Sequence, residues 1–164
     1  MVHNVKLGKN MRSVSIVGIG ATPFFNGVQN ETYKGLTNGE LFGHAALDAM
    51  KDAGVEPRDV QYFFHGSANP HVLNNCITPN LQVADWFGMR GKGSLSHSEG
   101  CCTGYIALEE AVFAVASGAY DVVLTGCSEQ GTGMPDGNTP DHMRVPLTSE
   151  VLFPDLDSIF DRAY

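Results

Sequence analysis

Positively charged residues are scarce in this chain of 164 residues, which has 10 Lys and Arg against 18 Asp and Glu and a net charge of −8. No cluster of Lys or Arg stands out, so the sequence lacks the basic footprint of a nucleic-acid-binding protein. No apolar run approaches the length that crosses a membrane, and residues 1–10 lack the apolar core of a signal peptide. We therefore expect a cytoplasmic protein that has neither nucleic acid nor a membrane as a partner.

The sequence also lacks the cysteine spacing of a metal site. Its four cysteines are Cys76, Cys101, Cys102 and Cys127. No two of them form a CxxC pair, and reduced thiols are normal in the cytosol. A Cys/His set could be assembled from Cys76, His71 and His97, but no ligand motif repeats along the chain. We expect no metal.

The length suits one well-cored domain, and a content of 43% hydrophobic and 17% charged residues is ordinary for a globular protein. Residues 1–10 look like a polar extension. A regular apolar pattern runs through residues 11–130 and dissolves into a loop region over residues 131–164. We therefore expect one domain over residues 11–130. The segment after it has the composition of a loop region to which further polypeptide is attached.

Four strands are predicted, at Val14–Ile19, Val60–Gly66, Ser94–Gly100 and Asp121–Cys127. Three helices are predicted between them, at Glu40–Gly54, at Pro79–Gly88 and from the end of the third strand to about Gly118. The first and fourth strands are apolar enough to be buried. Cys127, which ends the fourth strand, is interpreted as a core residue, and the alternative is that it faces the site. The third strand is short and polar, as an edge or interface strand is. The alternation predicts an α/β fold with a mostly parallel sheet and helices on its faces.

The end of the third strand carries the strongest chemical signal. Cys101 and Cys102 stand where this strand gives way to a helix with apolar residues at three- and four-residue intervals. A thiol there meets unpaired backbone N–H groups and the positive end of the helix dipole, which favour the nucleophilic thiolate. Gly100 and Gly104 keep side chains away, as a close-lying substrate requires. The alternative is that these cysteines are small buried hydrophobes, as most free cysteines are.

A second set of candidates follows the second predicted strand. That strand delivers His65 and Asn69 to its carboxyl end, the edge at which open α/β sheets bind ligands. We therefore name both residues as candidates for substrate binding.

The stretch Ser98-Glu-Gly-Cys-Cys-Thr-Gly-Tyr-Ile-Ala-Leu108 resembles the nucleophile motif of thiolases. In that motif a cysteine, a small residue, Ser or Thr, and glycine open a buried helix. Three further stretches are similar to the sterol-carrier-protein and archaeal acetyl-CoA acetyltransferase branch: Ser13–Phe24, Gly54–Val60 and Ala119–Gly126. The resemblance covers Met11 to Gln130 and implies the N-terminal half of a thiolase-like fold.

The register of the motif implies Cys101 as the catalytic nucleophile. With Cys101 in that role, Thr103, Gly104 and Ala107 all match the family pattern, whereas a shift to Cys102 breaks the match. The resemblance then implies that the Cys101 N–H is one donor to an oxyanion hole, with Gly104 beside it. Glu99 and Gly100 depart from the family pattern, which leaves the substrate geometry open.

The resemblance also implies a second half that is missing from this sequence. In thiolases that half supplies an activating histidine in a Gly-His-Pro-type loop and a second cysteine, and neither motif occurs here. The implied activity is acyl transfer from an acyl-CoA to CoA or a carbon nucleophile through a cysteine acyl-enzyme. The implied setting is lipid metabolism. A second chain could supply the missing half. A chain without that half would expose an apolar patch.

Two alternatives stay open. One is a thiolase-like lyase that cleaves a CoA ester by a retro-aldol reaction, in which Cys101→Ala would leave turnover largely intact. The other is a non-catalytic module that binds CoA esters or assembles with a partner, in which modification of Cys101 would change nothing measurable.

Partners and cofactors are expected from the same resemblance. It implies a homodimer through Ser94–Gly100, which Leu95→Pro or Ser96→Pro should weaken by removing ladder hydrogen bonds. A small partner with an OB-fold and a zinc ribbon is neither required nor excluded. Coenzyme A is implied as a substrate, and no metal or redox cofactor is implied.

Overall fold

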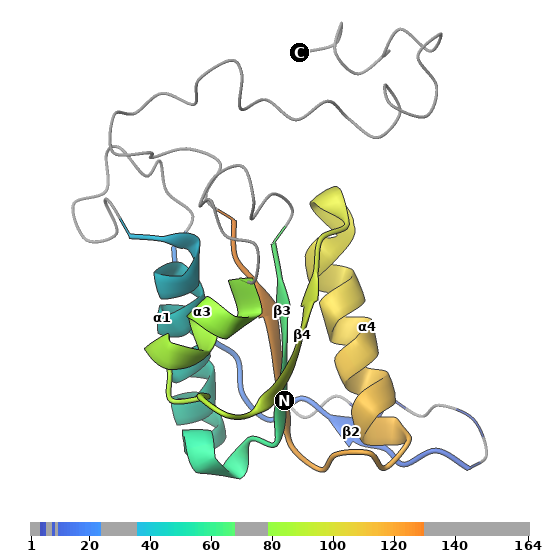
Figure 1. Cartoon of the computed structure of the whole chain (residues 1–164). Coiled ribbons are helices and arrows are strands. Elements are labelled where there is room, and N and C mark those ends of the chain that lie inside the picture. Colours follow the sequence, from blue (N-terminus) through green and yellow to red (C-terminus); the bar gives the residue numbers. More distant parts are fainter. Residues whose placement is uncertain (1–3, 6–7, 9, 24–35, 68–78, 130–164) are drawn as a thin grey trace, which may run out of the picture.

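A three-stranded parallel sheet lies between two layers of helices in the computed structural model (Figure 1). The structure describes residues 4–5, 8, 10–23, 36–67 and 79–129. The strands are β3 (Tyr62–Gly66), β4 (Gly93–His97) and β5 (Val123–Cys127), in the order β4-β3-β5. Both pairings are parallel, with Tyr62 opposite Gly93 on one side and Val123 on the other. The predicted α/β fold with a parallel sheet is thus confirmed.

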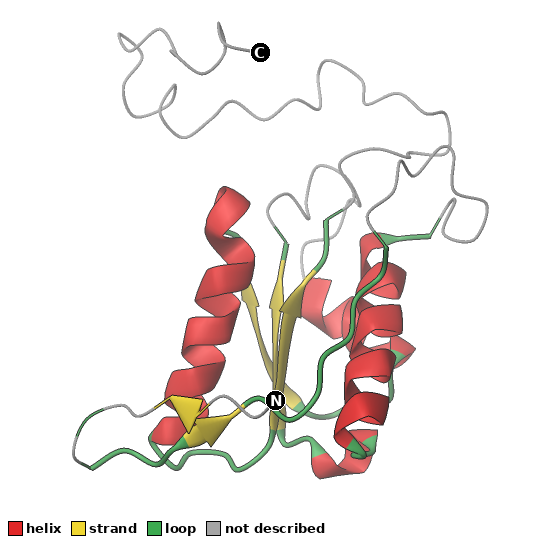
Figure 2. Cartoon of the chain, turned by 180° about the vertical axis from the view of Figure 1, so that it is seen from behind, coloured by secondary structure: helices red, strands yellow, loops and turns green. Residues whose placement is uncertain are grey.

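Helices cover both faces of this sheet, as predicted (Figure 2). The helices α1 (Asn38–Ala53) and α3 (Pro79–Trp86) pack on one face, and α4 (Thr103–Ala116) packs on the other. Phe63 and Leu124 point to the first face, where they join Phe42 and Phe87 in the larger buried cluster. Phe64 points to the second face. There it meets the small residues Ala107 and Ala111 of α4, which let this helix approach the strands closely.

The helix α1 shows most plainly how local sequence sets a boundary. The Thr37 hydroxyl accepts a hydrogen bond from the Glu40 N–H at 3.2 Å, while the Glu40 carboxylate accepts one from the Thr37 N–H at 2.6 Å. This reciprocal capping box starts the helix at Asn38, two residues before the predicted start. Gly54 ends the helix in the left-handed region, with φ of 69°, as its glycine predicted.

The strand β4 lies at the edge of the sheet, which confirms the expectation for the third predicted strand. It ends at His97, three residues before the predicted end at Gly100. The strand stops there because the short 3-10 helix η2 (Gly100–Cys102) already turns the chain toward α4.

The prediction of a buried strand over Val14–Ile19 is wrong for the described residues. Only β2 (Val14–Ser15) is a strand, and it pairs antiparallel with β1 (Asn4–Val5), which lies within the predicted polar extension. Val17 and Ile19 are 61% and 73% exposed, because no described strand lies beside them to cover or pair with them.

The chain from residue 16 to residue 23 instead runs along α1 (Figure 2). A Cβ atom at Gly18 would overlap the Ala49 carbonyl oxygen, and one at Gly20 would overlap the Ala45 carbonyl oxygen. These two glycines therefore allow the extended segment to lie directly on the helix backbone.

Arg12 anchors the start of this segment to the far end of α4. Its guanidinium bonds the Asp121 carboxylate at 2.6 Å, the Tyr120 carbonyl at 2.7 Å and the Val115 carbonyl at 3.1 Å. Its backbone N–H donates to the Ala116 carbonyl at 2.9 Å. Arg12 thus binds two carbonyl groups of the last turn of α4, that of Val115 through its guanidinium and that of Ala116 through its backbone N–H.

In the described part of the chain, every helix is too short or too polar to cross a membrane.

We predict that Thr37→Ala lowers the free energy of unfolding by about 1 kcal/mol, because the Glu40 N–H loses its acceptor. Urea denaturation of the purified chain measures the change. Thr37→Ser keeps a hydroxyl at the same place and should retain most of the stability. Equal losses in the two variants would contradict a role for the capping hydroxyl.

Candidate active site

The candidate site lies at the carboxyl edge of the sheet, where the three strands end level with one another. Gly66, His97 and Cys127 lie side by side in the strand register. Two backbone bonds continue the sheet one residue further, from the Ser67 N–H to the His97 carbonyl at 3.1 Å and from the Ser128 N–H to the Gly66 carbonyl at 3.0 Å. Open parallel sheets bind ligands at this edge.

Cys101 lies in η2, between β4 and the first residue of α4, so its predicted place at the junction of strand and helix is confirmed. The turn into the helix is fixed by Thr103, which is buried. The Thr103 hydroxyl accepts from the Glu99 N–H at 2.8 Å and donates to the Gly100 carbonyl at 2.7 Å. Gly100 has φ of 57°, which favours glycine. The backbone of Cys101 is therefore held at the N-terminus of a 14-residue helix.

Cys102 is exposed, so the second thiol of the pair is open to reagents. This arrangement leaves its predicted role, as the small residue after the nucleophile, untested.

The prediction that Cys127 is a core residue is wrong, because the structure leaves this side chain exposed at the carboxyl edge. It is the last residue of β5 and lies beside the first turn of α4. A Cβ atom at Gly104 would come within 2.6 Å of the Cys127 sulfur. Partial burial, together with the charge of Glu129, raises the pKa of the Cys127 thiol. Packing against Cys127 is therefore a sufficient reason for glycine at position 104, whatever a substrate requires there.

His65 lies beneath the edge, in the core of the sheet. Its side chain is fully buried, its ring meets Phe42 edge to face at 4.7 Å, and its Nε2 lies 3.1 Å from the Ser128 hydroxyl. Burial lowers the pKa of His65 to about 4, so the ring is neutral at pH 7. Its predicted contact with substrate stays a prediction, and Asn69 lies outside the described residues.

Sequence reasoning missed a buried polar link that ties α1 to the site. The Asn38 amide donates to the Ser67 hydroxyl at 2.8 Å, and both residues are buried. Nothing in the sequence indicates a role for Asn38, because its partner Ser67 follows β3 and lies 29 residues away along the chain.

His97 ends β4 with its ring stacked on Phe64 at 6.2 Å. Its Nε2 is buried without a hydrogen-bond partner among the described residues. His71 and Cys76 lie outside those residues, so the expectation of no metal stays a prediction.

The sequence of this chain is similar to those of known proteins over most of its length. The family model for the N-terminal domain of thiolases matches residues 14–153. An acetyl-CoA acetyltransferase of Methanocaldococcus jannaschii is 29% identical over 129 residues, and one of Methanothermobacter thermautotrophicus is 27% identical over 126 residues. These matches cover 79% and 77% of this chain. The chain spans 31% of the length of both relatives.

Solved structures share the fold. The priming β-ketosynthase of a polyketide biosynthetic pathway superposes with a TM-score of 0.57 at 21% identity, over 70% of this chain and 41% of its own. The 3-oxoacyl-[acyl-carrier-protein] synthase III of Aquifex aeolicus gives 0.54 at 21% identity, over 59% of this chain and 31% of its own. At this identity the likeness establishes the fold alone. Since the family model matches well over half of the chain, the resemblance predicted from the nucleophile motif is confirmed, and the chain belongs to the thiolase family, whose N-terminal domain it contains.

Proposed function

We propose that this chain takes part in acyl transfer from an acyl-CoA, with Cys101 as the residue that carries the acyl group. The carrying observation is the place of Cys101, at the N-terminus of α4 on the ligand-binding edge of the sheet, in a turn fixed by the Thr103 hydroxyl. The archaeal relatives, which are acetyl-CoA acetyltransferases, support this class of reaction. The cytoplasm is the proposed compartment, because thiols stay reduced there.

The proposed chemistry has two steps. The Cys101 thiolate attacks the thioester carbonyl, and coenzyme A leaves as a thiolate, so that one thioester replaces another. A second CoA or a carbon nucleophile then attacks the acyl-cysteine and releases the thiolate. Both steps pass through an oxyanion, which backbone N–H groups and the dipole at the start of α4 would stabilise. Coenzyme A is a substrate in this scheme, and neither step needs a metal or a redox cofactor.

The base that activates Cys101 is proposed to come from polypeptide outside the described residues. His65 is neutral and could accept a proton, but it is fully buried and its Nε2 is already within bonding distance of Ser128. We therefore assign His65 a positioning role, in which it holds the end of β5 against the sheet. A second chain, or a further part of the same polypeptide, would supply the base.

The acyl-enzyme is tested by incubating the chain with acetyl-CoA and measuring the intact mass. Because the helix start favours the thiolate even without the activating base, we expect slow addition of the mass of one acetyl group and peptide mapping to place it on Cys101. Cys101→Ser should abolish the adduct, whereas the matched variant Cys102→Ser should keep it. An adduct that survives in Cys101→Ser and disappears in Cys102→Ser would overturn the assignment of the nucleophile.

A missing adduct in the wild-type chain has a separate meaning. Circular dichroism should first verify that the chain is folded. A folded chain that binds acetyl-CoA by calorimetry but forms no adduct would contradict acyl transfer by this chain alone, and would favour the module that binds CoA esters without turnover.

The positioning role of His65 predicts a dependence of stability on pH. Because burial lowers its pKa from 6.5 to about 4, the unfolded chain binds a proton in this range that the folded chain does not. Stability is therefore complete above pH 6.5 and falls as the pH drops toward 4, by on the order of 3 kcal/mol. Urea unfolding across this range measures the slope.

The control for this prediction is a second histidine. His65→Gln should remove most of the slope between pH 6.5 and 4, whereas His44→Gln, which changes an exposed residue of α1, should retain it. Equal slopes in the two variants would show that His65 is not the group responsible.

We also propose that two copies of the chain pair through the free edge of β4, which has no strand partner among the described residues. The bond from the Ser67 N–H to the His97 carbonyl shows that His97 faces β3, and alternation along the strand then directs Leu95 to β3 and Ser96 to the free edge. Leu95 is also 43% exposed, which supports an apolar contact there.

The strand geometry predicts different effects for the two proline variants. Ser96→Pro removes one N–H donor at the free edge of each subunit, so a dimer should weaken by about 1 kcal/mol for each lost bond. Ser96→Ala keeps the N–H and should leave the dimer intact. Leu95→Pro should instead break a bond to β3 and lower the stability of the monomer. Sedimentation equilibrium measures the dimer, and an unchanged dissociation constant in Ser96→Pro would contradict pairing at this edge.

A further inference from the structure

The thiol of Cys127 lies against the first turn of α4, close to the turn that carries Cys101. A Cβ atom at Gly104 would lie 2.6 Å from the Cys127 sulfur and 3.5 Å from the Cys127 Cβ atom. Since a Cβ atom lies about 1.5 Å from its own Cα atom, this sulfur is within about 4 Å of the backbone of α4. Cys127 is nevertheless exposed at the carboxyl edge, so its thiol is accessible.

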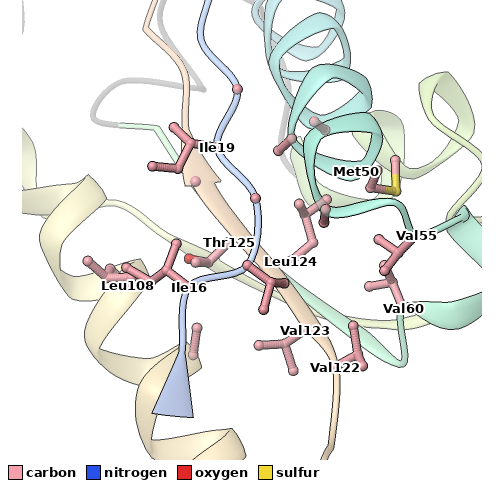
Figure 3. A pocket seen from close by; sticks show the side chains of 18 of the residues that line it. Ile16, Ile19, Met50, Val55, Val60, Leu108, Val122, Val123, Leu124 and Thr125 are labelled. Carbon is pink, nitrogen blue, oxygen red and sulfur yellow. The ribbon is translucent and has the colours of Figure 1, made fainter. Parts of the chain in front are cut away.

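One side of α4 faces β5, and Cys101 lies on the extension of that side. Leu108, one turn after Gly104, lines a cavity that β5 also borders (Figure 3). Cys101 lies one turn before Gly104, since three residues make one turn of a 3-10 helix. Positions 101, 104 and 108 therefore follow one another along this side. Cys102 is turned away from it by about a third of a turn.

The gap between the two thiol-bearing residues is small. One turn of a 3-10 helix advances about 6 Å, so Cys101 is one turn from the place where the Cys127 sulfur contacts Gly104. The Cα atoms of a disulfide lie roughly 4.4 to 6.8 Å apart. A shift of η2 toward β5 would close the remaining distance, and η2 is a single short turn ahead of the body of α4.

Cys102 is a poor partner for Cys101, although the two are adjacent in the sequence. Consecutive Cα atoms are about 3.8 Å apart across a trans peptide bond. This is less than the roughly 4.4 Å that the Cα atoms of a disulfide require, so a bond between the neighbours would be strained. Among the described residues, Cys127 is therefore the partner that the geometry favours.

We propose that Cys101 and Cys127 form a reversible disulfide when the chain meets a peroxide, so that the thiol of Cys101 is protected from further oxidation. The peroxide transfers one oxygen atom to the Cys101 thiolate, which becomes a sulfenic acid, and a hydroxide ion leaves. The Cys127 sulfur then attacks the sulfenic sulfur, and the hydroxyl group leaves with the thiol proton as water. A dithiol reductant restores both thiols by exchange. Acyl transfer is not part of this proposal.

The surroundings of the two thiols set the order of these steps. The start of α4 favours the thiolate of Cys101, and a thiolate is the form that peroxide oxidises. Partial burial and the charge of Glu129 raise the pKa of the Cys127 thiol, so this side chain keeps its proton at pH 7. Cys101 is therefore oxidised first, and Cys127 then resolves its sulfenic acid. Transient disulfides of this kind are compatible with the cytosol.

The test treats the reduced, folded chain of 164 residues with hydrogen peroxide, blocks the remaining thiols with iodoacetamide and maps the peptides without reductant. A protease specific for glutamate cuts at Glu109 and Glu110, between the adjacent cysteine pair and Cys127. We expect a monomer that takes up two fewer alkyl groups than the untreated chain. We also expect a link between the peptides of residues 100–109 and 111–129, which dithiothreitol should separate.

Three serine variants identify the linked thiols. Cys102→Ser is the matched control and should form the link at the wild-type rate, whereas Cys101→Ser and Cys127→Ser should lose it. In Cys127→Ser, Cys101 should instead gain two oxygen atoms as a sulfinic acid, at least tenfold faster than in the wild-type chain. Circular dichroism should verify that each variant is folded.

Four outcomes would overturn the proposal. A link that persists in Cys127→Ser would join Cys101 to Cys102 or Cys76 instead. A disulfide-bonded dimer in place of the linked monomer would place the bond between two copies. Sulfinic acid that forms at Cys101 equally fast in the wild-type chain and in Cys127→Ser would show that the two thiols do not meet. A folded wild-type chain in which Cys101 stays reduced would exclude the first step. Because no acyl-CoA is present, none of these outcomes tests the proposed acyl transfer.

Discussion

The parallel pairing of β3 with both of its neighbours is the constraint on which the rest of the structure depends. It brings Gly66, His97 and Cys127 to one level, so the chain leaves three strands at the same edge. The turn that holds Cys101 follows one of these strands, and the helix α4 then packs back across β3 and β5. A shift of one residue in this register would exchange the two faces of a strand and move Phe63 and Phe64 out of their separate clusters.

Short side chains hold the residues around Cys101 and the end of β5 in place from several directions. Thr103 uses its hydroxyl both as an acceptor and as a donor, which a valine of similar shape cannot do. Gly104 leaves just enough room for the Cys127 sulfur, and His65 holds Ser128 from below. The Thr103 bonds are local to the turn that holds Cys101, whereas the contacts of Gly104 and His65 join α4 and β3 to the end of β5.

The sequence predicts those features that depend on neighbours along the chain. The end of α1 was predicted from Gly54, whereas its start was predicted two residues late, at Glu40, although the Thr37 and Glu40 pair that fixes it is also local. The place of Cys101 follows equally well, because a strand, a tight turn and a helix start stand side by side in the sequence. The burial of His65 could not be predicted, since it depends on Phe42 and Ser128 from two other elements. The burial of Val14–Ile19 was predicted wrongly because a strand needs a partner, and the pattern of one segment does not reveal whether that partner lies within the described chain.

The contact of Gly18 and Gly20 with α1 also bears on how such a protein is made. A ribosome releases residues 14–20 before α1, and α1 before the three-stranded sheet, and a chain generally folds from its N-terminus as it emerges. Pairing of β3 with β4 and β5 is slower, because a long loop must close before the contacts form. The two glycines therefore let the first apolar segment pack on α1, which follows it along the chain, before the sheet has formed.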